Sequence, residues 1–120
     1  MVVDFRFPRP HRLLTPEAFT RVFREGFRSS DPLFTLLAAP NGLPAPRLGL
    51  AVSRKVSPRA VGRNRIKRQA RESFRHVCKD IPAIDIVVMA KKEAAAATNA
   101  ELRNSLDRHW QRLASKCVTS

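Results

Sequence analysis

Hydrophobic residues recur along this chain with two different periods, and each period predicts one kind of secondary structure. Near the start, Phe19, Val22 and Phe23 share one face at helical spacing. Near the end, a longer stripe at the same spacing is formed by Leu102, Leu106, Trp110 and Leu113. We therefore predict one helix over residues 16–25 and another from about residue 99 to residue 113.

Residues that favour helix ends stand at the borders of both segments. Thr15 can cap the first helix, Pro16 fits its first position, and Gly26 supplies a stop. Thr98 and Glu101 have the spacing of a capping box, in which each side chain bonds the backbone N–H of the other residue. These signals indicate where the two predicted helices begin and where the first one ends.

Three segments between these helices have the length and composition of strands. Residues 32–40 are short, apolar and bounded by prolines. Residues 47–56 alternate between a bulky face and a small face. The bulky face carries Leu48, Leu50 and Val52, and the small face carries Gly49, Ala51 and Ser53. Residues 84–90, "IDIVVMA", are almost entirely apolar, which predicts a central strand buried on both faces.

A third helix is predicted before the last strand, from Ser57-Pro58, a cap followed by a proline, to about Lys79. Gly62 inside it lowers the stability of the helix by roughly 1 kcal/mol relative to alanine. The helix contains "GRNRIKRQARESFR", in which six cationic residues accompany one carboxylate, Glu72. Its apolar side comprises Ile66, Ala70, Ser73, Phe74 and Val77, and the opposite side comprises Asn64, Arg68, Arg71 and Arg75. Helix surfaces kept only for solubility usually mix their signs. We therefore expect a sheet to cover the apolar side while the arginines form an array that can bind phosphate oxygens.

Composition and charge restrict the interpretation. The chain has 120 residues, 43% of them hydrophobic, which indicates one folded domain over residues 1–120, with residues 1–12 as an extended arm and residues 114–120 as a tail. Its 23 Lys and Arg residues against 10 Asp and Glu residues give a net charge of +13. A small domain tolerates such self-repulsion best when a polyanion neutralises it, so the charge implies nucleic acid or an anionic membrane as a partner.

Several classes of protein are made improbable by the same sequence. The longest apolar run, residues 86–90, is far below the roughly 20 residues of a membrane-spanning helix, and the start lacks the pattern of a secretory signal. We therefore expect a cytoplasmic protein with no membrane partner and with reduced cysteines. The acidic residues show no ligand-like spacing, which argues against an autonomous metal-dependent nuclease. We expect the scattered histidines to be exposed or incidental, namely His11, His76 and His109.

At this level the sequence predicts a binder of polyanions and nothing finer. A basic helix of this kind can lie on DNA, on ribosomal RNA or on another RNA. A structural RNA-binding protein of the ribosome or its assembly therefore stays open as an alternative.

Two neighbouring stretches carry a more specific pattern. The strand "RLGLAVSRKV" is followed after a few residues by "RNRIKRQARESFR", so a Ser-basic-basic strand exit leads into a helix with an Arg-Asn-Arg signature. This combination resembles the bacterial ribonuclease P protein subunit family. The opening from Phe5 to Gly26 and the segment "DIVVMAKK" at residues 85–92 are similar to other parts of that family. The resemblance covers the chain from Phe5 to Leu113.

The resemblance implies an α+β fold in the order αβββαβα, with a left-handed βαβ crossover and a basic amphipathic helix on a small sheet. General rules favour a right-handed crossover, and the strand that we did not predict would come from around residues 27–31 or from a split of residues 32–40. The family implies a protein component of the ribonuclease P endoribonuclease that is inactive alone. In that holoenzyme the RNA subunit holds the active site and its magnesium ions, and the 5′ leader of precursor tRNA is removed. The implied partners are catalytic RNA and precursor tRNA, with no cofactor, metal site or small-molecule substrate for the protein itself.

The resemblance also implies two binding surfaces. The basic helix would contact the catalytic RNA through Arg63, Asn64, Arg65, Lys67, Arg68 and Arg71. A cleft between the first helix and the sheet would take the leader, lined or rimmed by Phe19, Phe23, Phe34, Ser53, Arg54, Lys55 and Lys91. The alternative for the phenylalanines is a place in the core. The family often has a second aromatic residue near position 37, where this chain has Leu37 and therefore lacks one possible stacking partner.

Overall fold

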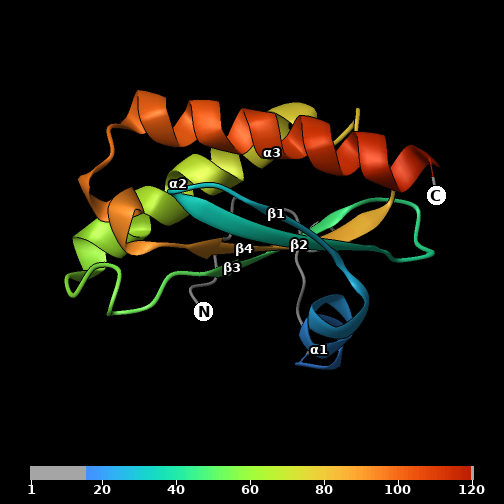
Figure 1. Ribbon diagram of the computed structural model, residues 1–120, viewed down its shortest axis with the longest axis horizontal. Coiled ribbons are helices and arrows are strands. Elements are labelled where there is room, and N and C mark those ends of the chain that lie inside the picture. Colours follow the sequence, from blue (N-terminus) through green and yellow to red (C-terminus); the bar gives the residue numbers. More distant parts are fainter. Residues whose placement is uncertain (1–15, 120) are drawn as a thin grey trace.

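The computed structural model describes residues 16–119, with side chains as far as Lys116 (Figure 1). The predicted arm at residues 1–12 and the predicted cap Thr15 lie outside this range. The elements follow the order α1 (Pro16–Glu25), β1 (Phe27–Ser30), β2 (Phe34–Pro40), β3 (Arg47–Ala51), α2 (Ala60–Val77), β4 (Ile84–Ala90), the 3-10 helix η2 (Lys92–Ala96) and α3 (Asn99–Thr119).

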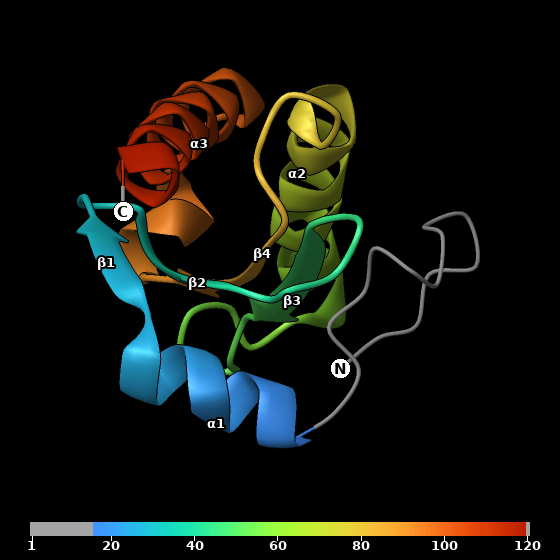
Figure 2. The ribbon, with the colours of Figure 1, turned by 90° about the vertical axis from the view of Figure 1, so that its right-hand side faces the viewer.

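The four strands form one mixed sheet in the order β1-β2-β4-β3. β4 pairs antiparallel with β2 and parallel with β3, so Val87 is the partner of Leu37 on one side and of Gly49 on the other. The prediction that residues 84–90 form the central strand is confirmed. In Figure 2, β3 and β4 point away from the viewer, α2 lies above them and β4 lies to the left of β3, which makes the crossover left-handed. The structure has the α+β fold that the resemblance implied.

Helices cover both faces of this sheet, and two separate apolar clusters result. α2 and α3 lie on one face and α1 lies on the other (Figures 1 and 2). The main core fills the first interface, and its large buried side chains include Phe34, Leu36, Ile66, Phe74, Ile86, Leu102, Leu106, Trp110 and Leu113. The cluster under α1 is smaller and comprises Ala18, Val22, Leu37, Ala39 and Val87. The predicted apolar sides of the two long helices are confirmed.

Several predicted borders differ from the structure, and the strand predicted over residues 47–56 ends at Ala51, as β3. The strand predicted over residues 32–40 is confirmed as β2, which begins two residues later, at Phe34. Asp31 Oδ1 accepts two backbone hydrogen bonds, of 2.8 and 2.9 Å, in the turn that separates β1 from β2. The strand that we did not predict is therefore residues 27–30, with the sequence FRSS, whose polar residues conceal it from a search for apolar runs. Residues 114–119 continue α3 instead of forming a tail, because no glycine or proline ends the helix there.

The starts of α3 and α2 follow local side-chain contacts. The Thr98 N–H donates to Glu101 Oε1 at 2.8 Å, and the Glu101 N–H donates to Thr98 Oγ1 at 3.1 Å, so the predicted capping box is confirmed. α2 begins only at Ala60, and Ser57 does not cap it, because the Ser57 side chain is buried beneath Gly62. A Cβ on Gly62 would collide with Ser57 Oγ, so glycine at this position allows the close approach of the preceding loop.

The prediction that His109 is exposed is wrong, because its ring is fully buried between α3 and β1. Nδ1 lies 2.6 Å from Ser29 Oγ, and Nε2 lies 3.1 Å from Asp31 Oδ2. Burial lowers the pKa of His109 and outweighs the Asp31 carboxylate, so the imidazole is neutral in the folded protein near pH 7. The position was predictable from spacing, because His109 follows Leu106 by three residues and precedes Leu113 by four, inside the buried stripe.

Candidate nucleic-acid interface

The outward side of α2 carries a cationic surface, here called the α2 arginine face, formed by Asn64, Arg68, Arg71 and Arg75. Asn64, Arg68 and Arg75 are exposed, and Arg71 is half-buried beside them. The opposite side of α2 is packed in the main core, so the helix backbone holds these side chains at fixed spacing. Fixed guanidinium groups suit the closely spaced phosphates of a folded RNA.

The two arginines of the Arg-Asn-Arg signature also bind groups of the protein. The Arg63 guanidinium donates to two backbone carbonyls in the loop before α2, at 3.0 and 2.9 Å. The Arg65 guanidinium donates to Asn99 Oδ1 at 2.8 Å and to two carbonyls of η2, at 3.2 and 3.5 Å. Both arginines therefore tie neighbouring segments to α2, while Asn64 between them points outward.

Lys67 differs from the other five predicted contact residues of α2, because it is buried, with 7% of its surface exposed. Burial lowers the pKa of Lys67, and the nearby charges of Arg63 and Arg71 lower it further. A phosphate therefore reaches the Lys67 side chain less easily than it reaches the exposed side chain of Arg68.

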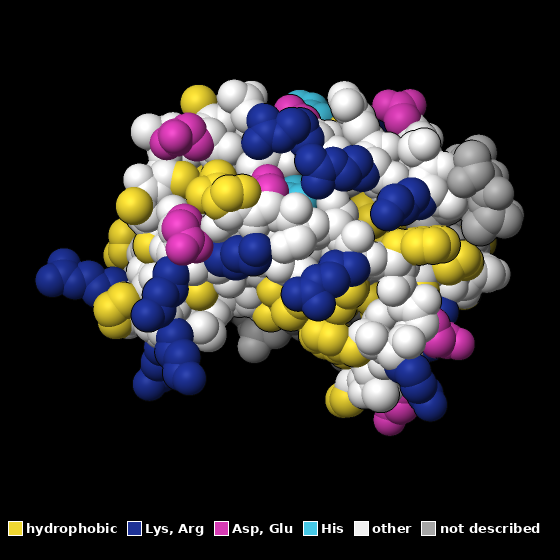
Figure 3. Space-filling model, viewed as in Figure 1, with side chains coloured by type: hydrophobic (Ala, Val, Ile, Leu, Met, Phe, Trp, Pro, Cys, Tyr) yellow, Lys and Arg dark blue, Asp and Glu magenta, His cyan; other side chains and the backbone are white. Residues whose placement is uncertain are grey.

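The other face of the sheet is only partly covered by α1. Ala18 and Val22 point at the sheet, and Phe19 and Phe23 lie together on one flank of the helix. Phe19 packs against the small cluster together with Met89 of β4, whereas Phe23 is 51% exposed. Figure 3 shows hydrophobic side chains in a hollow between α1, at the lower right, and the rest of the molecule. We call this surface, lined by Phe19, Phe23 and Met89, the α1 recess.

Basic residues stand at one edge of the α1 recess. β3 and β4 are parallel and Ala51 pairs with Met89, so the residues that follow both strands meet at the same edge of the sheet. There Lys91 Nζ donates to Ser30 Oγ at 2.9 Å. The loop after β3 adds three exposed residues, Ser53, Arg54 and Lys55. The shared basic rim predicted from the sequence is thus present, and Figure 3 shows Lys and Arg side chains around the hydrophobic surface.

The prediction that Phe34 lines the cleft is wrong, because its ring is fully buried in the main core. Successive strand residues point to opposite faces, so Phe34 and Leu36 face α2 and α3 while Leu37 faces α1. The almost entirely apolar sequence of β2 does not reveal which residues point to which face. Leu37 lies on the sheet face that α1 covers. The aromatic residue that the family often has near this position is therefore missing from the α1 side of the sheet and not from the main core.

Sequence reasoning missed a buried charge cluster beneath α1. Asp85 is fully buried and accepts hydrogen bonds from Arg21, Arg47 and Asn41. The available signal was that Asp85 is the single polar residue of "IDIVVMA". In residues 16–119, no three His, Cys, Asp or Glu side chains gather as a metal site, and no helix there is long and apolar enough to cross a membrane.

Comparison with known proteins connects this geometry to a family. The family model for ribonuclease P matches residues 7–114. The chain belongs to the ribonuclease P protein family. It is 50% identical over 116 residues to the ribonuclease P protein component of Methylococcus capsulatus, which covers 97% of this chain and 91% of that protein. It is 51% identical over 107 residues to the same component of Photobacterium profundum, which covers 89% of this chain and 91% of that protein.

Solved structures of ribonuclease P proteins share the fold. The Staphylococcus aureus protein superposes with a TM-score of 0.79 at 33% identity, covering 87% of this chain and 94% of that one. The Thermotoga maritima protein gives 0.75 at 33% identity, covering 84% and 96%. The chain is therefore a protein component of bacterial ribonuclease P, an endoribonuclease that acts in tRNA 5′ maturation, and its partner is ribonuclease P RNA. The alternative of a ribosomal protein is set aside.

Proposed function

We propose that the α2 arginine face binds the catalytic RNA and that the α1 recess takes the single-stranded 5′ leader of precursor tRNA. The observation that supports this division is the position of the two surfaces. α2 and α1 cover opposite faces of one small sheet (Figure 2), so a single rigid domain can contact two RNA segments at once. A protein that only neutralised charge would need no such separation.

The α1 recess has the chemistry of a single-strand binding site. Unpaired bases stack on exposed aromatic rings, here Phe23 and the accessible part of Phe19. The phosphates between those bases meet the basic rim, which includes Arg54, Lys55 and Lys91. Base-paired RNA hides the faces of its bases, so the recess favours a leader over the folded body of tRNA.

The chemistry of cleavage belongs, in this proposal, to the RNA subunit and its magnesium ions, in the cytoplasm where tRNA precursors are processed. The protein alone is expected not to cleave precursor tRNA. Its charge of +13 is expected to lower the magnesium concentration that the catalytic RNA needs, because it neutralises crowded phosphates. Cleavage by protein freed of RNA would refute this assignment.

The leader assignment is tested by Phe19→Leu in the reconstituted holoenzyme. The change keeps most of the apolar volume and removes part of a base-stacking contribution of about 1–3 kcal/mol. Affinity is expected to fall for leader-bearing precursor tRNA and to stay nearly constant for mature tRNA at the same salt concentration.

The matched control is Phe27→Leu, because Phe27 is exposed on β1 and lies on the same sheet face as Ser29, which contacts α3. That variant should leave both affinities unchanged. Equal losses for both tRNAs with Phe19→Leu would contradict the proposal. A large fall in its melting temperature would show that Phe19 acts as a core residue.

A further inference from the structure

α1 is attached to the sheet by a small apolar contact. Within residues 16–119, the cluster beneath it contains five buried residues, Ala18, Val22, Leu37, Ala39 and Val87, with Phe19 and Met89 packed against them. Two of these are alanines, so little apolar area holds the helix, whereas α2 and α3 bury the large rings and leucines of the main core. The position of α1 therefore depends on additional, polar contacts.

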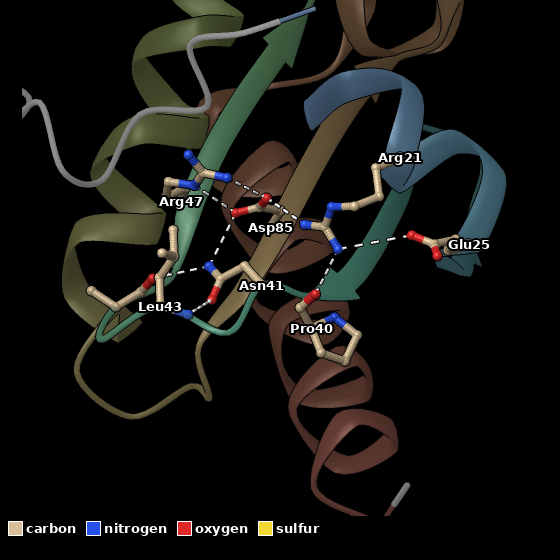
Figure 4. Close-up of polar contacts among 8 residues, drawn as sticks. Arg21, Glu25, Pro40, Asn41, Leu43, Arg47 and Asp85 are labelled. Carbon is tan, nitrogen blue, oxygen red and sulfur yellow. Dashed lines mark hydrogen bonds and ion pairs between the residues drawn. The ribbon is translucent and has the colours of Figure 1, made fainter. Parts of the chain in front are cut away.

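The strongest of these contacts converge on Asp85, at the start of the central strand (Figure 4). Arg21 of α1 donates to Asp85 Oδ2 at 2.7 Å. Arg47 of β3 donates to Oδ1 at 2.8 Å and to Oδ2 at 2.7 Å, and Asn41 donates to Oδ1 at 3.0 Å. Arg21 also donates to the Pro40 carbonyl at 2.7 Å. One side chain of α1 is thus bound to the ends of two strands.

Asp85 is charged although it is fully buried. Burial alone would raise the pKa of Asp85, but the hydrogen bonds from Arg47, Asn41 and Arg21 outweigh burial and lower that pKa. The hydrogen bond to Asp85 likewise raises the pKa of Arg47. A buried ion pair of this kind loses its favourable geometry when either partner changes, so it constrains the direction in which Arg21 points.

The constraint acts across the width of α1. On the helix, Arg21 lies on one flank and Phe19 and Phe23 lie on the other, with Ala18 and Val22 between them against the sheet. A rotation of α1 about its axis that releases Arg21 therefore moves both phenylalanines relative to Met89. The ion pair and the α1 recess are thus coupled through the rotation of one helix.

We propose that Asp85 is a positioning residue for leader recognition, because it fixes the rotation of α1 and thereby the width of the α1 recess. This inference rests on the proposed function of the recess, but its structural part concerns the free protein alone. Asp85 touches no RNA in this scheme, since its side chain has no exposed surface. Its effect on binding passes through Arg21 and α1.

The test is Asp85→Asn, which keeps the shape of the side chain and removes its charge. In the free protein, amide hydrogen exchange of α1 is expected to become at least about tenfold faster, while exchange in α3 stays unchanged. In the holoenzyme, affinity for leader-bearing precursor tRNA is expected to fall about threefold to tenfold, with mature tRNA affinity and the cleavage rate of bound substrate unchanged. The direction of this change in affinity is informative, because removal of a negative charge would by itself strengthen RNA binding.

Two further variants distinguish a specific effect on α1 from a general loss of stability. Trp110→Phe perturbs the main core on the opposite face, where Trp110 Nε1 donates to Ser73 Oγ at 2.6 Å, and it should lower stability without a selective loss of leader affinity. Arg21→Gln leaves Asp85 in place and removes its α1 partner, together with the Arg21 hydrogen bond to the Pro40 carbonyl. It should reproduce the faster exchange of α1, which keeps the test decisive if Asp85→Asn folds poorly.

Each outcome has a separate meaning. Unchanged α1 exchange in both Asp85→Asn and Arg21→Gln would overturn the inference. Faster exchange with unchanged leader affinity would also overturn it, since the rotation of α1 would then not set the recess. If the holoenzyme with the unmodified protein binds leader-bearing and mature tRNA equally, the proposed function fails, and that failure is visible without any variant.

Discussion

Replacing Arg68 and Arg71 together by alanine removes two cations from the α2 arginine face while leaving the buried side of the helix intact. Each phosphate contact with duplex RNA contributes roughly 0.9 to the slope of log affinity against log salt, by analogy with duplex DNA. If each arginine neutralises one phosphate, the slope falls by about 1.8. Over a fourfold rise in salt, the variant should therefore lose about tenfold less affinity for the catalytic RNA than the unmodified protein loses.

The assay is a series of binding curves with the cognate catalytic RNA at about 50 to 200 mM monovalent salt, a range over which such slopes are large. Arg65→Ala is the matched control, because the Arg65 guanidinium bonds Asn99 and η2. It should lower the melting temperature and leave the slope nearly unchanged, well below the roughly 0.9 expected for one lost phosphate contact. An unchanged slope in the folded double variant would refute the assignment of the α2 arginine face.

Three further predictions concern stability. Phe34→Leu should lower the unfolding free energy by about 1–2 kcal/mol in urea titrations without a selective loss of leader affinity. A selective loss of leader affinity would show that Phe34 contributes to the α1 recess after all. The lowered pKa of His109 means that the unfolded chain binds this proton first, so the contribution of His109 to stability is full above its ordinary pKa of 6.5 and falls as the pH drops below it. His109→Gln should flatten that dependence, and identical pH profiles would contradict the neutral state of the buried ring. Thr98→Ala should cost about 1 kcal/mol by removing half of the capping box, whereas Asn104→Ala, exposed on the same helix, should not destabilise the protein.

A buried helix face or a buried strand produces a recognisable pattern of apolar residues in the sequence, and the elements with such a pattern were predictable. The stripe that contains Leu102 and Trp110, the wheel of α2 around Phe74, and the continuous apolar run of β4 all correspond to the main core. The capping box was predictable for a related reason, since its two hydrogen bonds depend on residues three apart in sequence.

Features that depend on distant pairing left no comparable trace. β1 is held by its register with β2 and by Ser29 beside His109, so its four residues carry no apolar pattern of their own. The face to which Phe34 points is set by packing of the whole sheet, because both faces of β2 are buried. The two arginine partners of Asp85 are distant in sequence, Arg47 by 38 residues and Arg21 by 64 residues. Spacing along the chain therefore could not identify them.

The position of β4 between β2 and β3 sets the order in which the sheet can be completed during synthesis. β2 and β3 follow each other in sequence but are not neighbours in the sheet, so the residues made first can form only the β1–β2 pair. β3 gains its partner only after residues 84–90 have been made, and until then the apolar side of α2 has no complete sheet to cover. Pairing between distant segments is slow relative to helix formation. Of the 23 Lys and Arg residues, 17 precede residue 84, so the nascent chain is already strongly cationic while its sheet is still open, and folding competes with RNA binding in the same interval.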